Sequence, residues 1–314
     1  MKRFLLSVVM LSVVVASGQA APSGIPAKLE VANGKTANAF LQSLKDGTLT
    51  FQTQQAATST TAPASKIKSL TFFLKYDAES VEQSFNNADY SDVIATLGSL
   101  LEPYWEFMSI SNNLQTAFGM LVQSHLENGD FTQVQRAGEI LLENSSPRLF
   151  LQGQVYTALA ALSDTNTFAI AEKLCGEVDS EAAGLYLKAC IERAKGNPAA
   201  ASQIVTDIIA DHGNDMDWMP VSELLSAHLY LDAGMTNYAV SAAMQVQHIY
   251  MGASRVAQDA AKFNAALNID VEAARKTENA PKKVTKAAEE EEEQDSSTDT
   301  ETTEEEEQDS STEE

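Results

Sequence analysis

The sequence predicts a mainly α-helical protein, with a small β-module before an array of helical hairpins and a disordered acidic tail after it. Three observations predict this. Apolar and polar positions alternate in residues 28–73, apolar residues recur at helical spacing in 77–275, and residues 276–314 are strongly polar. With 314 residues, of which 44% are hydrophobic, the chain has enough apolar material for about two domains.

The first twenty residues have the pattern of a signal peptide. Basic residues precede the apolar run 4–16, and the small residues Gly18 and Ala20 satisfy the rule for cleavage after Ala20. A retained anchor is the alternative, but the run is shorter than the roughly 20 residues that span a bilayer. We expect residues 1–20 to be removed and the mature protein to be exported, to the periplasm or outside the cell, without spanning a membrane.

Residues 21–76 are predicted to form a small β-barrel. The dipeptides Asn33-Gly34 and Asp46-Gly47 separate alternating segments and are strong hairpin signals. Strands are expected over residues 28–31, 36–44, 48–51 and 67–73. Because closure removes exposed strand edges, so many short strands favour a barrel or a strongly bent sheet.

This β-module resembles the Sm-like or SH3-like barrels of bacterial envelope proteins. The resemblance rests on "LEVANGKTANAFLQSLKDGTLTF", which contains two glycine turns, and on the ending "APASKIKSLTF". Some Sm-like barrels bind RNA, but the module lacks a basic or aromatic platform for nucleotides. We expect it to dock a partner or to pack on the following domain.

Residues 77–275 are predicted to form paired helices. Five small polar turns interrupt the helical pattern, near Ala88, Gly129, Ser163, Gly196 and Gly234. Their spacings of 41, 34, 33 and 38 residues lie close to the repeat of about 34 residues that is typical of tetratricopeptide proteins. The pattern therefore predicts an array of helical hairpins.

The last two pairs resemble tetratricopeptide repeats most. In "EAAGLYLKACIERAKGNPAAASQIVTDIIADHG", Ala189 and Ala201 occupy the small positions of the two helices, and Ala227 and Ala239 do so in the next unit. Small residues let the helices of a hairpin approach closely. The family's early Trp and late Pro are missing, so a generic α-solenoid is the alternative. Residues 254–275 are expected to form a helix that caps the open end.

The resemblance implies a groove lined by the first helix of each pair, which would take a peptide from a partner. Counting back from the turn glycines, the candidate groove residues are Gln123, Leu126, Tyr186, Cys190, Arg193, Leu224, His228 and Leu231. The set lacks the paired Lys, Arg and Asn that grip a peptide carboxylate in the best-known members. A groove that is merely solvated, or filled by the chain itself, is the alternative.

Cys175 and Cys190 are expected to be buried free thiols. Export permits a disulfide. On neighbouring antiparallel helices, however, Cys175 would lie just before the turn and Cys190 well beyond it, an offset of roughly 10 Å at about 1.5 Å per residue. That separation is too large for a disulfide.

The sequence contains no catalytic or cofactor signature, so we expect neither an enzyme nor a cofactor. The four His residues form no metal-binding motif, and phosphate-loop, dinucleotide and nucleophile-elbow patterns do not occur. The acidic stretch 211–217 fails the EF-hand rule, because Met216 and Ser222 stand where Gly and Glu are required. The aromatic run 103–107 either forms an exposed rim or packs between hairpins, and packing is favoured because aromatic residues dominate core burial.

The net charge of −23 is concentrated in the tail, which carries 15 acidic and no basic residues between Glu289 and Glu314. Such a balance disfavours nucleic acid as a partner. A segment with so little apolar surface is expected to be disordered, and it serves either as a solubiliser or as a docking arm for a basic partner.

Together these features predict an exported, non-catalytic protein–protein interaction scaffold. The first alternative is a structural or oligomerising subunit of a cell-envelope assembly. The second is an enzyme with an unrecognised site.

Overall fold

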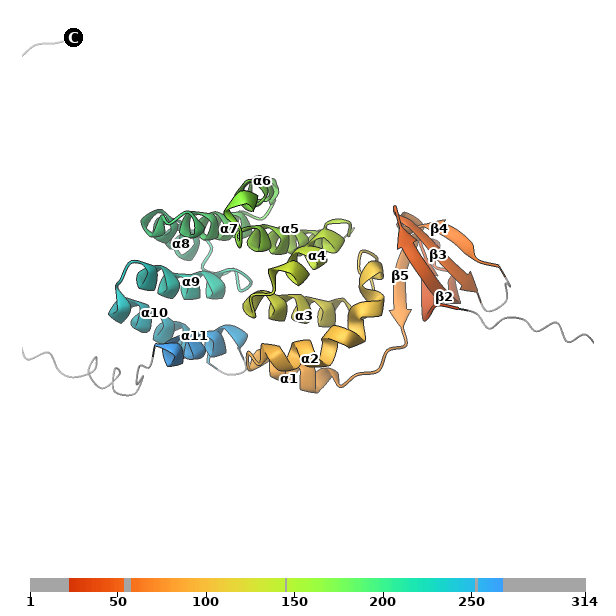
Figure 1. Cartoon of the computed structure of the whole chain (residues 1–314), viewed down its shortest axis with the longest axis horizontal. Helices are drawn as coiled ribbons and strands as arrows, with labels where there is room; N and C mark the ends of the chain where they lie inside the picture. Colours follow the sequence, from red (N-terminus) through yellow and green to blue (C-terminus); the bar gives the residue numbers. More distant parts are fainter. Residues whose placement is uncertain (1–22, 54–57, 145, 252–253, 268–314) are drawn as a thin grey trace, which may run out of the picture. The chain divides into compact units, whose positions relative to one another are not determined.

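The computed structural model describes residues 23–53, 58–144, 146–251 and 254–267 (Figure 1). The predicted signal peptide 1–20 and acidic tail 276–314 lie outside the described residues, as does the end of the helix predicted over 254–275. Within these ranges the chain is mainly helical, with one antiparallel sheet of five strands followed by eleven α-helices.

The strands are β1 (Ile25–Val31), β2 (Thr36–Lys45), β3 (Thr48–Thr53), β4 (Thr60–Pro63) and β5 (Ile67–Phe72), in the spatial order β4-β3-β2-β1-β5. Both predicted hairpin turns are confirmed. Lys45 pairs with Thr48 across a two-residue loop in which Asp46 and Gly47 have φ of 48° and 68°, as a twisted hairpin requires.

The prediction of a closed barrel is wrong, because β4 and β5 are the two edges of an open sheet among the described strands. Residues 111–113 cover the β5 edge instead. The Leu70 N–H donates to the Ser111 carbonyl at 2.9 Å, and the Asn113 amide bonds both the N–H and the carbonyl of Phe72. The other edge is short and ends at Pro63, which has no N–H to offer another strand. At β5 these contacts replace closure as the protection of the edge, whereas the β4 edge is left unpaired among the described strands.

The sheet shares one apolar core with the first helices. Leu41 of β2 and Phe72 of β5 belong to the same buried cluster as Leu97. The predicted boundary between residues 76 and 77 therefore separates sheet from helix but does not separate their cores. In the aromatic run 103–107, Trp105 and Phe107 are 2% and 0% exposed, so the packing alternative is confirmed.

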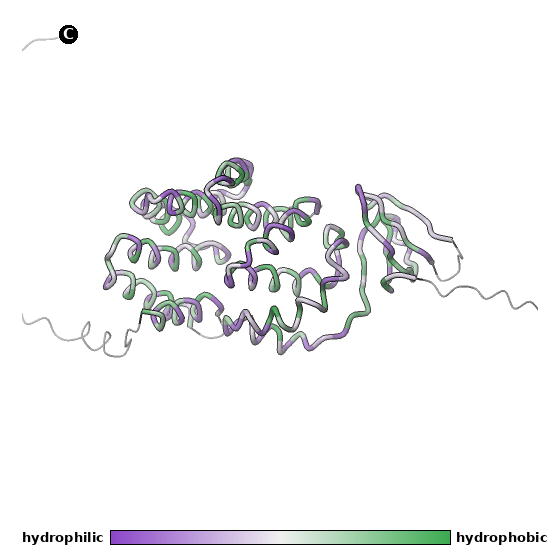
Figure 2. Tube along the Cα trace, in the orientation of Figure 1, coloured by the Kyte–Doolittle hydropathy of each residue, from purple (hydrophilic) through white to green (hydrophobic). Residues whose placement is uncertain are grey.

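The helices are α1 (Ala78–Asn86), α2 (Tyr90–Leu101), α3 (Gln115–Glu127), α4 (Phe131–Leu142), α5 (Pro147–Ala161), α6 (Phe168–Glu177), α7 (Glu181–Ala194), α8 (Pro198–Asp211), α9 (Met219–Asp232), α10 (Thr236–Ile249) and α11 (Arg255–Ala266). Hydrophobic and hydrophilic residues interchange along each of them (Figure 2), as expected for helices that bury one face.

All five predicted turns lie between consecutive helices, at the ends of α1, α3, α5, α7 and α9. Gly129, Gly196 and Gly234 have φ of 77°, 80° and 75°. This left-handed conformation lets the backbone N–H groups beyond a helix bond its last carbonyls, as when the Asp130 N–H donates to the His125 carbonyl at 2.9 Å. The four small positions at Ala189, Ala201, Ala227 and Ala239 are fully buried.

Each helix packs on the next, and the last one also meets the first. Helix α11 packs on α9 and α10 and also contacts α1, beside which it lies in Figure 1. We expected this helix to cap an open end. Its contacts instead bring residues separated by more than 160 positions together, as when the Tyr90 hydroxyl bonds Asp259.

Candidate ligand-binding cavity

The helices border an open cavity of about 760 Å³ with walls from α3, α5, α7, α9 and α11. Six of the eight predicted groove residues line it, namely Leu126, Tyr186, Cys190, Arg193, Leu224 and His228. Gln123 lines two neighbouring cavities instead. Leu231 is not among the lining residues, and its neighbour Asp232 borders the cavity in its place.

The cavity has a largely apolar wall. Leu159 and Leu162 of α5 face it together with Val221 and Leu224 of α9. The ring of Tyr186 packs on Trp218, with 5.5 Å between the ring centroids. A ligand with apolar side chains would find ready contact here.

Three polar side chains of α7 and α9 that line the cavity, Arg193, Asp232 and His228, are already partnered or neutral. The Arg193 guanidinium donates to both carboxylate oxygens of Asp232, at 2.6 and 3.4 Å. Burial, and secondarily Arg193, lowers the pKa of His228 to about 4. Its imidazole is therefore neutral at pH 7, and it packs edge-on against Phe263.

Both cysteines are free, as predicted, but they are half-buried. Cys190 faces the cavity, and burial raises the pKa of its thiol to about 12. Burial also raises the pKa of Cys175, which lies on α6. Because the thiolate is the reactive form, neither side chain is poised as a nucleophile.

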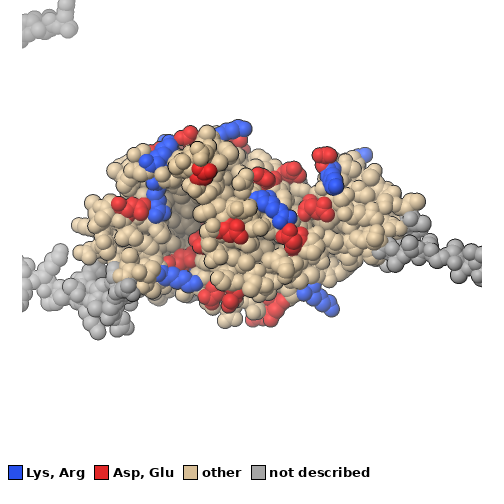
Figure 3. Space-filling view, in the orientation of Figure 1, with Lys and Arg blue, Asp and Glu red and all other residues tan. Residues whose placement is uncertain are grey.

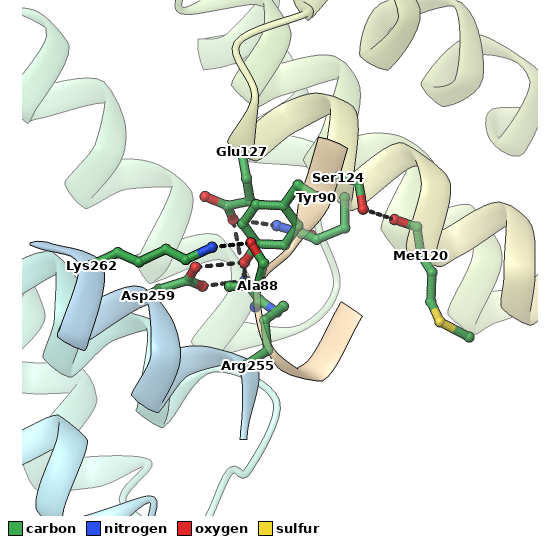
Figure 4. A network of polar contacts seen from close by, with 9 residues as sticks. Ala88, Tyr90, Met120, Ser124, Glu127, Arg255, Asp259 and Lys262 are labelled. Atoms are coloured by element: carbon green, nitrogen blue, oxygen red, sulfur yellow. Dashed lines mark hydrogen bonds and ion pairs between the residues drawn. The ribbon is translucent and has the colours of Figure 1, made fainter. Parts of the chain in front are cut away.

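Sequence reasoning missed the charged residues at the opposite side of the cavity. Glu127, Arg255 and Asp259 all line it. Arg255 donates to Glu127 Oε1 at 3.2 Å and to Asp259 Oδ2 at 3.0 Å (Figure 4). The only local signal is the i,i+4 spacing of Arg255 and Asp259, which equally fits a solvated helix face. Their pairing with α2 and α3 depends on the tertiary fold.

Two further cavities, of about 220 and 580 Å³, adjoin the large one. Arg255 lines all three, and Gln123, Arg148 and Gln152 line both of the smaller ones. Over the face in Figure 3, acidic and basic side chains are interspersed and form no extended patch of one sign. The charges on this face are therefore mixed in sign rather than arranged to attract a polyanion.

Within the described ranges, no cluster of three or more His, Cys, Asp or Glu side chains is arranged to hold a metal ion. None of the described helices is both long and apolar enough to cross a membrane. Comparison with protein-family models, with curated proteins and with solved structures gives no match for this chain.

Proposed function

We propose that this chain is an exported, non-catalytic interaction protein that holds a peptide segment of a partner in the central cavity. The supporting observation is that tetratricopeptide-like counting of the sequence selects residues from α3, α7 and α9, and that six of them line one cavity. Such an array offers a concave surface to a peptide.

The state of the polar groups favours binding over catalysis. The Cys190 thiol stays protonated and the His228 imidazole stays neutral at pH 7. Arg193 is already neutralised by Asp232. A general base or a nucleophile needs an activating partner, whereas these groups are suited to hydrogen bonding and packing.

The charge of the cavity selects the kind of peptide. Three carboxylates line it, from Glu127, Asp232 and Asp259, against the two guanidinium groups of Arg193 and Arg255. The remaining wall is largely apolar. The cavity wall thus has one more carboxylate than guanidinium groups. A segment with apolar side chains and one Lys or Arg complements this wall best, since an acidic side chain would be repelled by the additional carboxylate.

Fluorescence anisotropy with a panel of labelled ten-residue peptides tests this function. The peptides share apolar residues and differ in carrying no charge, one Lys or one Glu. We expect the Lys peptides to bind the mature chain best, and Leu224→Glu, which places a charge in the wall, to abolish binding. The control Ile209→Glu makes a comparable change at an exposed position of α8 outside the cavity. Equal binding by all peptides, or binding that survives Leu224→Glu, would contradict the proposal.

A structural, oligomerising role is the second candidate, and the open sheet is the observation that favours it. Strand β4 has a free edge, and Phe73, directly after β5, is 59% exposed. An unpaired edge is a template for a strand of another copy. Sedimentation of the full chain over a range of concentrations tests this role, which predicts a rising mass that Thr61→Pro on β4 suppresses.

A further inference from the structure

The contacts that join the helices are of two physical kinds. Four buried apolar clusters follow one another along the chain: one from the sheet to α5, one over α5–α7, one over α7–α9 and one over α9–α11. None of these four clusters includes both α11 and the helices α1–α3. The contact that closes the array is therefore not built on an apolar core.

That contact is a polar seam, formed by Tyr90 of α2, Glu127 of α3 and Arg255, Asp259 and Lys262 of α11 (Figure 4). The Tyr90 hydroxyl donates to Asp259 Oδ1 at 2.6 Å, and Arg255 joins Asp259 to Glu127. Lys262 donates to the carbonyl of Ala88 and lies 3.6 Å from the Asp89 carboxylate.

The seam is only partly withdrawn from water. The side chains of Arg255 and Asp259 are 18% and 14% exposed, whereas Glu127 is 34% exposed. Burial raises the pKa of both Asp259 and Glu127, so ionising them inside the seam has a cost. Ion pairs of this kind gain little over hydrated charges, because water and salt compensate both partners once they separate.

The same residues form a wall of the cavity. Glu127, Arg255 and Asp259 line it beside Val256 of the first turn of α11. When α11 moves away from α2 and α3, it stays attached to α9 and α10 through the apolar cluster of Val246, Val256 and Ala260. Separation at the seam thus widens the cavity without dismantling a core.

We propose that the polar seam is the point at which the helical array opens, and that its opening widens the central cavity around a ligand. The identity of the ligand as a peptide rests on the proposed function. The opening itself does not, because it follows from the difference between the polar seam and the apolar contacts elsewhere.

The two free cysteines provide the test, since Cys190 lines the cavity while Cys175 lines none of the three cavities. The full chain is treated with N-ethylmaleimide, and the rate at each cysteine is followed by mass spectrometry. Arg255→Met removes the central cation of the seam. We expect it to raise the rate at Cys190 at least about a hundredfold while the rate at Cys175 stays unchanged, because the seam then opens more often.

A milder variant and a matched control complete the design. Tyr90→Phe deletes only the hydroxyl that bonds Asp259, and a smaller rise of about threefold at Cys190 is expected. The control Arg136→Met removes an arginine that pairs with Glu102 at 2.9 Å and lies over Trp105, away from the cavity. It should leave both rates unchanged.

An unchanged rate at Cys190 in both seam variants overturns the proposal. An equal rise at both cysteines overturns it as well, because the opening would then be global. The assay contains no peptide, so its result is independent of the anisotropy measurements. Peptides that fail to bind while Cys190 responds would reject the proposed function and keep the opening at the seam.

Discussion

The contact between α4 and α5 and the contact of α11 with α2 and α3 each join two parts of the helical array, by opposite means. At the first, a Cβ added to Gly153 would lie 2.8 Å from the Leu142 nitrogen, and one added to Gly138 would lie 2.2 Å from Thr157 Oγ1. The second is held by charged and hydroxyl groups. The close fit of the two backbones therefore fixes the contact between α4 and α5. Hydrogen bonds and ion pairs that water can replace hold α11 against α2 and α3.

The largest effect is expected where the backbones touch. Gly153→Ala must push α4 and α5 apart and should cost about 4–5 kcal/mol of unfolding free energy. The control Gly98→Ala on α2, where an added Cβ meets nothing within 4 Å, should gain up to about 1 kcal/mol from helix propensity. Urea unfolding of both variants measures the difference. Equal stabilities would show that α4 and α5 tolerate separation.

The next largest loss of unfolding free energy is expected at the polar seam. Arg255→Met leaves two partly buried carboxylates without their cation and should cost about 3–4 kcal/mol. The double variant Arg255→Met/Asp259→Leu removes one of those carboxylates and should recover part of the loss. Thermal and urea unfolding of the two variants test this. A double variant less stable than the single one would show that the unpaired carboxylate is not the cause of the loss.

Protonation of His228 gives a smaller, pH-dependent effect. Its pKa is lowered to about 4 in the folded state, so the neutral form is favoured, and its full contribution to stability is present above the unfolded pKa of about 6.5. That contribution is lost as the pH falls from about 6.5 towards 4 and should amount to about 2 kcal/mol between pH 7.5 and 5.

The matched variant His228→Gln should remove most of this slope when urea unfolding is followed at both pH values. His125, whose pKa burial also lowers, should still supply the remainder. An unchanged slope in His228→Gln would show that other groups cause the pH dependence.

The smallest effect is expected at the cavity ion pair of Arg193 and Asp232. Its geometry is good, but the side chains are 35% and 36% exposed, so solvent screens the attraction and the coupling should stay below about 1 kcal/mol. A double-mutant cycle with Arg193→Met and Asp232→Ala measures it. A coupling free energy as large as the loss expected for Arg255→Met would show that this more exposed ion pair contributes as much as the partly buried pairs of the seam.

The local part of the fold was predictable from the residues. The turns at Gly129, Gly196 and Gly234 and the buried Ala227 follow from short-range rules of helix termination and packing. Six of the eight candidate groove residues from the same counting line one cavity, whereas Gln123 and Leu231 do not. The edges of the sheet were not predictable, because residues 111–113, far from the strands in sequence, protect β5.

The sequence by itself determined where the turns between most elements fall, which positions carry small or apolar residues, and where charge is concentrated, because these depend on neighbours a few residues away. It did not predict β4 (Thr60–Pro63), part of which its polar composition assigned to a loop. The tertiary structure decided that the sheet stays open, that α11 meets α1–α3, and that Arg255 and Asp259 enter the wall of the cavity. These outcomes depend on contacts between residues that are distant in the chain, such as pairs 41 and 169 positions apart, and a local hydrophobic pattern does not specify which distant residues will pair.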